Sequence, residues 1–472
     1  MAIIPAQRVA ELLGPWRREG VRSDRLAWAL RSLVLDGRLA VDSRLPAERT
    51  LAGVLAVSRA TVTAAYDRLR EEGYVESRQG AGSWVTLPGG HRPAPPDAIV
   101  GGAGLDLRIS ALPAPPVLEE IFGAAAREFP RWLDHHGYDP LGLPPLREAI
   151  AARFEQRGLP TRPEQILVTN GALHALDLTL RATAPRGRRA LVELPSYPAA
   201  LDALRGAGAR LTPAPLGRDG WDVDAIEASV RSEPPALAYL IPDFQNPTGL
   251  VMEQTARRRL LAALETTGAT VVIDETFAEL NLDGVSMPAP AGTFGGERTI
   301  TVGSLSKSVW GGLRVGWARA DPALILRLAT ARAAVDLASP LFEQIVATHT
   351  LERLDEILAE RREVIRIRRA ALADALDGRL PDWSYSLPAG GLFLWAELPA
   401  PIATSLALEA AARELQLSPG PRFAAAGLLE RYVRLPFTLA PWQLERAVRV
   451  LAELTPRVTP RPGRARVAQY VA

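Results

Sequence analysis

Lys307 is the only lysine in the chain, although the sequence holds 55 basic residues in all. It ends the segment Ser304-Leu305-Ser306-Lys307, and a glycine-rich stretch containing Arg314 follows at once. An amine can lose its proton near neutral pH and attack a carbonyl, whereas a guanidinium cannot. The sequence therefore predicts carbonyl chemistry at this one position. The alternative is that a bias toward arginine left a single lysine by chance.

Four further polar segments each follow a short apolar run, and they complete a candidate site. They are Thr169-Asn170-Gly171-Ala172, Pro195-Ser196-Tyr197-Pro198, Asn246-Pro247-Thr248-Gly249 and Asp274. Ligand sites in helix-covered parallel sheets lie beyond the carboxyl ends of the strands, so we expect these segments to meet. The amides of Gly171 and Ala172, at the start of a helix, can bind a phosphate. Taken singly each segment has an ordinary explanation, because a strand-end aspartate usually caps a helix and Asn-Pro-Thr-Gly is often only a turn.

In this order the segments resemble the site of fold-type I pyridoxal phosphate (PLP) enzymes, the aspartate aminotransferase superfamily, over roughly residues 105–455. The resemblance implies that Lys307 forms an aldimine with the cofactor and that Asp274 pairs with the pyridine nitrogen, which keeps the ring an electron sink. It also implies a set of cofactor contacts: Gly171, Ala172, Ser304 and Arg314 on the phosphate, Tyr197 stacked on the ring, and Asn246 on the 3′-oxygen. Arg434 would bind the α-carboxylate of an amino-acid-like effector through a bidentate pair.

Two other segments bear on this resemblance. The segment His136 to Pro140 resembles the early family segment whose tyrosine, here Tyr138, reaches the cofactor phosphate of a neighbouring subunit. This implies a homodimer with shared sites. The family also places a tyrosine two or three residues after the aspartate, where it hydrogen-bonds the 3′-oxygen, but this chain has Thr276 and Phe277. Thr276 offers the cofactor a hydroxyl but no phenol, so we expect weaker control of the proton steps.

The front of the chain, residues 24–86, has a different pattern: three helices and then a hairpin. Apolar residues recur at helical spacing from Leu26 to Val34, Pro46 opens a second helix, and Ser58 caps a third that runs from Arg59 to Glu72. Strands over 74–77 and 83–86 flank a glycine-bearing turn, which is typical of a wing.

This segment resembles a GntR-type winged helix, in Leu45-Pro46-Ala47-Glu48-Arg49, Val57-Ser58-Arg59 and the glycine wing. Side chains early in the third helix reach base edges when that helix enters a major groove, and its N-terminus favours phosphate. The residues expected to bind double-stranded operator DNA are Arg49, Ser58, Arg59, Thr61, Thr63, Arg78 and Gly80. The alternative for an exposed arginine such as Arg78 is a solvated surface.

Composition bounds the remaining possibilities. At 472 residues, with 47% hydrophobic residues, the chain is long enough for two or more units. It has no cysteine and only five histidines, which excludes disulfides and thiolate metal sites and argues against zinc, so we expect no metal. There is no leader-like start and no apolar run near 20 residues, so we expect a cytoplasmic protein.

The predicted organisation is multi-domain. A mainly helical winged helix-turn-helix domain, residues 1–87, precedes a proline- and glycine-rich linker, 88–104, and an α/β fold-type I aminotransferase-like domain with a mostly parallel sheet, 105–457. A basic tail, 458–472, ends the chain. Strands of that sheet are expected at 165–169, 189–193, 236–240, 270–274 and 299–303.

This layout resembles the MocR family of bacterial regulators. It implies a PLP-dependent transcription factor that senses an amino compound carrying a carboxylate, or PLP itself, through Lys307. Three alternatives stay open: a working aminotransferase that also binds DNA, a sensor of PLP concentration alone, and a cofactor-free dimerisation scaffold. The retained lysine argues against the scaffold.

Overall fold

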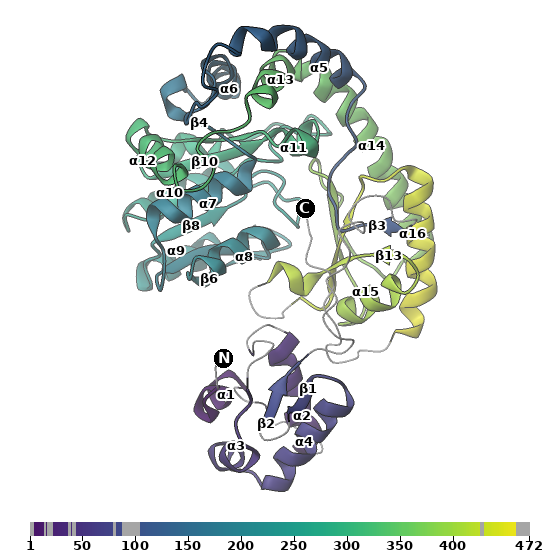
Figure 1. Ribbon diagram of the computed structural model, residues 1–472. Helices are drawn as coiled ribbons and strands as arrows, with labels where there is room; N and C mark the ends of the chain where they lie inside the picture. The colour runs from purple at the N-terminus through teal and green to yellow at the C-terminus, as the bar shows by residue number, and fades with distance from the viewer. Residues whose placement is uncertain are drawn as a thin grey trace.

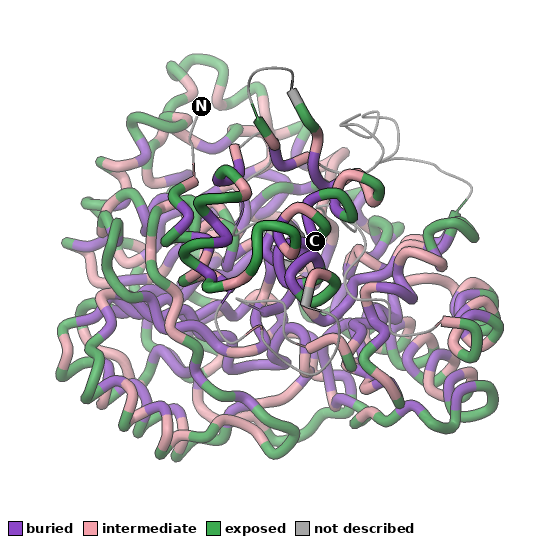
Figure 2. The backbone as a smooth tube through the Cα atoms, turned by 90° about the horizontal axis from the view of Figure 1, so that it is seen from below, coloured by how far each residue is buried: buried purple, intermediate pink, exposed green. Residues whose placement is uncertain are grey.

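The computed structural model describes residues 4–13, 16, 22–35, 39, 44–78, 82–86, 104–424 and 429–458. Nearly all of the expected linker and of the expected basic tail lies outside these residues, as does Gly80. In Figure 2 the buried segments of the backbone lie in the interior of the molecule, and the exposed segments lie around its outside.

The N-terminal unit has an apolar core of its own, formed by helices and by the β-hairpin that follows them in the sequence. Its elements are α1 (Ala6–Leu13), α2 (Arg22–Leu35), α3 (Glu48–Leu55), α4 (Arg59–Glu71), β1 (Val75–Arg78) and β2 (Gly82–Val85). The turn between α3 and α4 is tight because Ala56 takes a left-handed conformation, and Ser58 then caps α4 by accepting from the Thr61 amide at 3.1 Å. The predicted helices and hairpin are thus confirmed within a residue or two, while α1 was not predicted.

The large unit is organised around an eight-stranded sheet, in the order β4-β11-β10-β9-β8-β5-β6-β7. Its strands are β4 (Ile166–Thr169), β5 (Arg189–Leu194), β6 (Arg210–Gly217), β7 (Gly220–Trp221), β8 (Leu237–Leu240), β9 (Thr270–Asp274), β10 (Thr299–Ser304) and β11 (Gly316–Arg319). The strands from β10 through β6 run parallel, whereas β11 is antiparallel to both of its neighbours and β7 is antiparallel to β6. The mostly parallel sheet is confirmed.

Helices cover both faces of this sheet (Figure 1). One face packs on α7 (Ala172–Thr183), α8 (Pro198–Gly206) and α12 (Pro322–Arg332), and the other on α9 (Val223–Ser232) and α10 (Gln254–Glu265). Because both faces are covered, the central strands are almost wholly apolar, and polar side chains collect where the strands end.

A second sheet forms the core of a smaller unit, to the right of the large sheet in Figure 1. Its order is β12-β15-β14, and all its pairs are antiparallel. The elements around it are β3 (Leu105–Asp106), α14 (Leu354–Arg379), β12 (Phe393–Glu397), α15 (Ala403–Ala411), β13 (Leu415–Gln416), β14 (Ser418–Pro419), β15 (Tyr432–Pro436) and α16 (Pro441–Leu454). Strand β3 pairs with β13, so the start of the large domain is tied into this unit. The helices α5 (Val117–Glu128), α6 (Pro144–Gln156) and α13 (Leu341–Glu352) share its apolar cluster.

Candidate cofactor site and DNA-binding surface

Lys307 lies on the short helix α11 (Leu305–Ser308), immediately after β10 ends. The pKa of Lys307 is lowered to about 7, chiefly by burial; the positive charges of Arg434 and Arg314 contribute to this lowering, and the charge of Asp274 opposes it. A large fraction of the amine is therefore neutral, and nucleophilic, near neutral pH. The same electrostatic contacts place Lys307 among three of the side chains predicted from the sequence.

A concave, cationic corner lies beside this lysine at the start of α7. Gly171 has a φ of 97°, which a residue with a side chain rarely adopts, and a Cβ there would come within 3.2 Å of Arg314 Nη2. Arg314 is itself left-handed, and its guanidinium donates to the Asn170 carbonyl at 2.9 Å. Ser304 lies at the end of β10, where its Oγ accepts from the Ser306 amide at 3.1 Å. The corner combines a helix N-terminus, a guanidinium and a hydroxyl, which suits a phosphate dianion.

Asp274 lies at the carboxyl end of β9, and both of its oxygens are engaged. Oδ1 accepts from the Thr276 amide at 2.9 Å, and Oδ2 accepts from the Tyr239 hydroxyl at 2.6 Å. Tyr197 lies near this carboxylate, since burial raises the pKa of Tyr197 to about 12 with a contribution from the charge of Asp274. The sequence predicted Asp274 and Tyr197, but it gave no indication of Tyr239.

Arg434, on β15 of the smaller sheet, is completely buried. Its guanidinium lies between the rings of Phe393 and Phe423, 5.3 and 5.2 Å from their centroids, and donates to Asn246 Oδ1 at 3.1 Å. It also donates to the Arg108 carbonyl, but in the described part of the chain no acidic side chain pairs with it, and its Nε has no partner. Burial lowers the pKa of Arg434 to about 9. A buried guanidinium that no acidic side chain of the described residues neutralises has the chemistry to bind a carboxylate.

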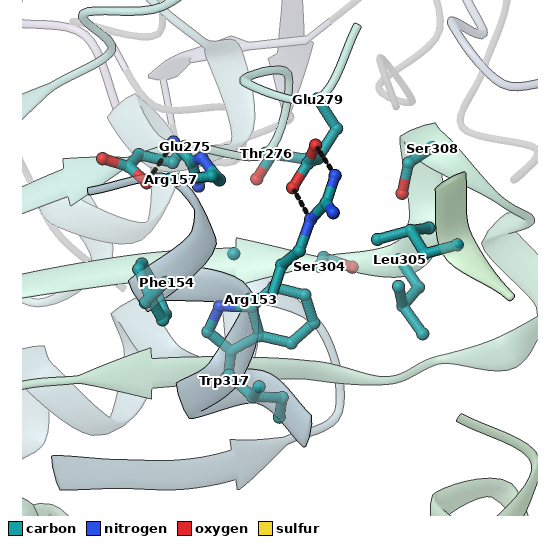
Figure 3. A pocket seen from close by; sticks show the side chains of 13 residues that line it. Arg153, Phe154, Arg157, Glu275, Thr276, Glu279, Ser304, Leu305, Ser308 and Trp317 are labelled. Atoms are coloured by element: carbon teal, nitrogen blue, oxygen red, sulfur yellow. Dashed lines mark hydrogen bonds and ion pairs between the residues drawn. The ribbon is translucent and has the colours of Figure 1, made fainter. Parts of the chain in front are cut away.

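Thr276 and Phe277, two and three residues after Asp274, have side chains in different surroundings. Phe277 is buried, with its ring centroid 6.0 Å from Lys307 Nζ and its edge against Phe393. Thr276 instead lines a cavity with Ser304 and Trp317, and its hydroxyl has no hydrogen-bond partner among the described residues (Figure 3). The side chain beside the lysine amine is thus a phenyl ring. The predicted contact of Thr276 with the cofactor stays a prediction.

The cavity in Figure 3 is walled by two ion pairs that hold α6 to the loop after β9. Arg153 binds Glu279 through two hydrogen bonds of 2.8 Å, and Arg157 lies 2.9 Å from Glu275. Burial raises the pKa of Glu275 although the charge of Arg157 opposes it. These pairs brace the segment that carries Asp274 and Phe277.

The remaining predicted residue of this domain, Tyr138, is 61% exposed. Its ring stacks on His136, and its backbone amide donates to the same histidine. It therefore projects from the surface, and its contact with a neighbouring subunit stays a prediction.

These groups fit PLP at both ends. The corner formed by Gly171, Ser304 and Arg314 would take the phosphate, and Asp274 would face the ring nitrogen. Lys307, the only lysine of the chain, would supply the amine to which the cofactor attaches. Among the described residues, no His, Asp and Glu side chains gather into a site for a metal ion.

The predicted DNA-binding residues gather around the start of α4. Arg49 on α3 is exposed, and the side chain of Arg59 is 72% exposed. Glu48 lies behind them: it accepts from the Thr63 hydroxyl at 2.8 Å and lies 3.7 Å from Arg59 Nε and 3.6 Å from Arg70 Nη2. The sequence did not identify this acidic contact.

Of the other residues predicted to bind DNA, the structure describes Ser58, Thr61 and Arg78. Ser58 and Thr61 engage each other at the helix start, Oγ to Oγ1 at 2.8 Å. Arg78 ends β1, next to the turn of the hairpin.

No helix in the described part of the chain has the length and apolar character that crossing a membrane needs.

Comparison with known proteins connects both halves to families. Residues 124–451 match the family of class I and II aminotransferases, and residues 22–85 match the gntR family of bacterial regulatory proteins. A 2-aminoadipate transaminase of Thermus thermophilus is 36% identical over 340 residues, which cover 69% of this chain and 83% of that protein. The probable rhizopine catabolism regulatory protein MocR of Rhizobium meliloti is 34% identical over 397 residues, 74% of this chain and 77% of that protein.

The solved structures agree. The α-aminoadipate aminotransferase LysN of Thermus thermophilus, in complex with N-(5′-phosphopyridoxyl)-L-leucine, superimposes with a TM-score of 0.68 at 34% identity. The superposition covers 75% of this chain and 92% of that one.

Proposed function

The chain belongs to the class I and II aminotransferase family and carries a GntR-type domain ahead of it, and on this premise we propose that it is a PLP-dependent transcriptional regulator that senses an amino compound, or PLP itself. Its cofactor is pyridoxal phosphate, which supplies an electrophilic carbon and an electron sink when bound. The observation that carries the proposal is the buried Arg434, which has no acidic partner among the described residues, near the single lysine of a chain that also has a winged helix.

In this proposal the chain's own residues divide the work. Lys307 attaches the cofactor, and its lowered pKa keeps the amine ready to react. Arg434 binds the carboxylate of the effector, and Phe393 and Phe423 exclude water from that contact. Asn246 already shares a hydrogen bond with Arg434, so the carboxylate contact and the predicted contact to the 3′-oxygen are adjacent.

A ligand that contacts both Lys307 and Arg434 joins the two sheets, because Lys307 follows β10 of the large sheet and Arg434 lies on β15 of the small one. The units already touch outside the site, where Arg218 donates to Ser384 and Glu397. Ligand binding can shift DNA affinity only if the two arrangements of these units bind the ligand differently. We propose that the shift passes to paired winged helices in a homodimer, with domain boundaries near residues 87, 104 and 457.

The test is to titrate candidate amino acids and PLP into one sample while recording both the cofactor's visible absorption and the affinity for operator DNA. A sensor changes both signals over the same concentration range. A change in absorption that leaves DNA affinity constant would refute the sensing role.

Arg59→Ala is expected to weaken operator binding by ~1–3 kcal/mol and to relax base preference, if the guanidinium contacts a base edge. Affinity measured at several salt concentrations, roughly 50 to 200 mM, separates base contacts from phosphate contacts. Arg68→Ala is the matched control, because Arg68 lies at the other end of α4 and is also solvent-exposed. Equal affinity of Arg59→Ala and the parent at every salt concentration would remove Arg59 from the interface.

The second candidate function is transamination, which the similarity to a 2-aminoadipate transaminase favours. Phe277 separates the two functions, because it puts a phenyl ring beside Lys307 where the aminotransferase family has a phenol. General acid and base groups contribute ~10²–10⁴-fold to rates, so a chain without the phenol can bind ligands normally and still turn over slowly.

Phe277→Tyr is therefore expected to raise transamination by ~10²-fold from a slow or undetectable parent rate. Steady-state assays with common amino acids and a keto-acid acceptor measure the change. Thr179→Val is the control: it removes a buried hydroxyl on α7 that donates to the Ala175 carbonyl, and it should leave the rate unchanged. Vigorous transamination by the parent protein would favour the enzyme.

A further inference from the structure

Tyr239 is a buried phenol whose hydroxyl meets the carboxylate of Asp274. It lies on β8, the parallel neighbour of β9, and is paired in register with Val272. Asp274 is two residues further along β9, so its side chain is on the same face, one step nearer the carboxyl end. Tyr239 is 1% exposed, and its hydroxyl donates to Asp274 Oδ2 at 2.6 Å.

The direction of this hydrogen bond is fixed by the surroundings. Burial raises the pKa of Tyr239 well above the ordinary value, and the charge of Asp274 adds to the effect, so the phenol keeps its proton. The oxygen to oxygen distance is in the range of charge-assisted bonds to a carboxylate, which are about twice as strong as neutral ones. Tyr239 is therefore the donor in this bond, and Asp274 Oδ2 is the acceptor.

We propose that Tyr239 is a positioning residue: its hydroxyl holds the carboxylate of Asp274 aimed at the pyridine nitrogen of the cofactor. This inference rests on the proposed role of Asp274. The Thr276 amide and the Tyr239 hydroxyl bind one oxygen each, which fixes the plane of the carboxylate and leaves its remaining lone pairs for the ring. A carboxylate held in this orientation would accept a hydrogen bond from the protonated ring nitrogen and so favour the positive charge on the ring.

The competing explanation is that Tyr239 only fills space. Its ring belongs to the apolar cluster under α7 and α8, which includes Val192 and Val272. A space-filling ring predicts that loss of the hydroxyl changes thermal stability and nothing in the cofactor. A positioning hydroxyl predicts a change in the cofactor itself, which is visible without DNA, effector or turnover.

The experiment uses the full chain loaded with PLP and records the visible band across pH for the parent and for Tyr239→Phe. The visible band changes at the pH where the nitrogen contributed by Lys307 loses its proton. A positive charge on the ring repels that proton and keeps this pH low. If Tyr239→Phe weakens the positive charge, the change in the band should occur at higher pH. We expect an upward shift of ~0.5–1 pH unit and a cofactor affinity ~10-fold lower, part of what a hydrogen bond to a charged group is worth. Thr179→Val is the matched control, because it removes a buried hydroxyl that donates to the Ala175 carbonyl, on α7. It should leave the transition unchanged.

Two more variants test the mechanism. In an Asp274→Asn background, adding Tyr239→Phe should no longer shift the transition, because the residue through which Tyr239 acts has gone. Replacing Tyr239 with 3-fluorotyrosine keeps the ring and strengthens the donor, so the transition should move to lower pH.

The proposal is overturned if Tyr239→Phe binds PLP with the parent's pH transition, or if the shift is the same with and without Asp274. If Asp274→Asn alone has no effect on the cofactor, the role of Asp274 falls, and this proposal with it. Failure of the sensing role would appear instead in the DNA titrations, and the cofactor measurement would stand.

Discussion

Lys307→Ala is expected to abolish covalent attachment of PLP and the visible band that accompanies it. No other lysine exists to replace this amine, and the residues around it offer no second nucleophilic nitrogen of that kind. Borohydride reduction of the parent should fix the cofactor to the single peptide that contains Lys307, and mass spectrometry should find no label in the variant. Label carried only by the N-terminal amine of the parent would overturn the cofactor assignment.

The same variant separates the two halves of the protein. The N-terminal unit has its own apolar core, so Lys307→Ala should fold and keep basal affinity for operator DNA. It should lose the response of that affinity to amino compounds. Lys307→Arg is the control for charge, since it retains a cation that cannot react with the cofactor aldehyde.

Arg434→Met is expected to reduce effector affinity by ~30-fold or more, because removing one member of a buried charge pair costs about 2–5 kcal/mol. PLP should stay bound, since the phosphate corner uses Arg314 and not Arg434. Without effector the variant should be somewhat less thermally stable than the parent, because Asn246 Oδ1 and the Arg108 carbonyl lose their donor. Titration of the cofactor band gives the affinity, and thermal unfolding gives the stability.

Arg361→Met is the matched control. Arg361 is another buried arginine that has no acidic partner among the described residues, and it donates to the carbonyls of Pro113 and Val309. Its loss should lower stability, because two buried carbonyls lose their donor, while effector affinity is kept. Unchanged effector affinity in Arg434→Met would place the carboxylate elsewhere.

The sequence predicted the strands of the large sheet best where both faces are covered. Strand β8 is a short apolar run, and β9 and β10 are rich in β-branched residues and end in Asp274 and Ser304, a pattern that has one main explanation. Strands β6 and β11 escaped prediction because their apolar content is diluted, by prolines in β6 and by a glycine and an arginine at the ends of β11. Helix α1 has only eight residues and depends on contacts of Ala6, Val9 and Leu13 with the core of the unit, which the local sequence does not reveal.

Some residues of the candidate site could likewise be predicted from the sequence, and others could not. Residues that the chain presents in recognisable segments, such as Lys307 and Arg314, could be predicted from type and spacing. Tyr239 could not, because its contact with Asp274 depends on the register of two neighbouring strands, and a tyrosine inside an apolar run is most simply a core residue. The unpaired state of Arg434 was equally hidden, since only the fold shows which acids stay out of reach.

Glu48 places a negative charge just behind the surface that is predicted to face DNA, bound to Thr63 and close to Arg59. A carboxylate there repels every phosphate backbone equally, so it lowers affinity for arbitrary sequence as well as for the operator. Only a site that offers base edges to Arg59 and Thr63 compensates for that repulsion. A chromosome presents millions of competing stretches, so a regulator that holds them loosely is less depleted by them and spends more of its time free to search.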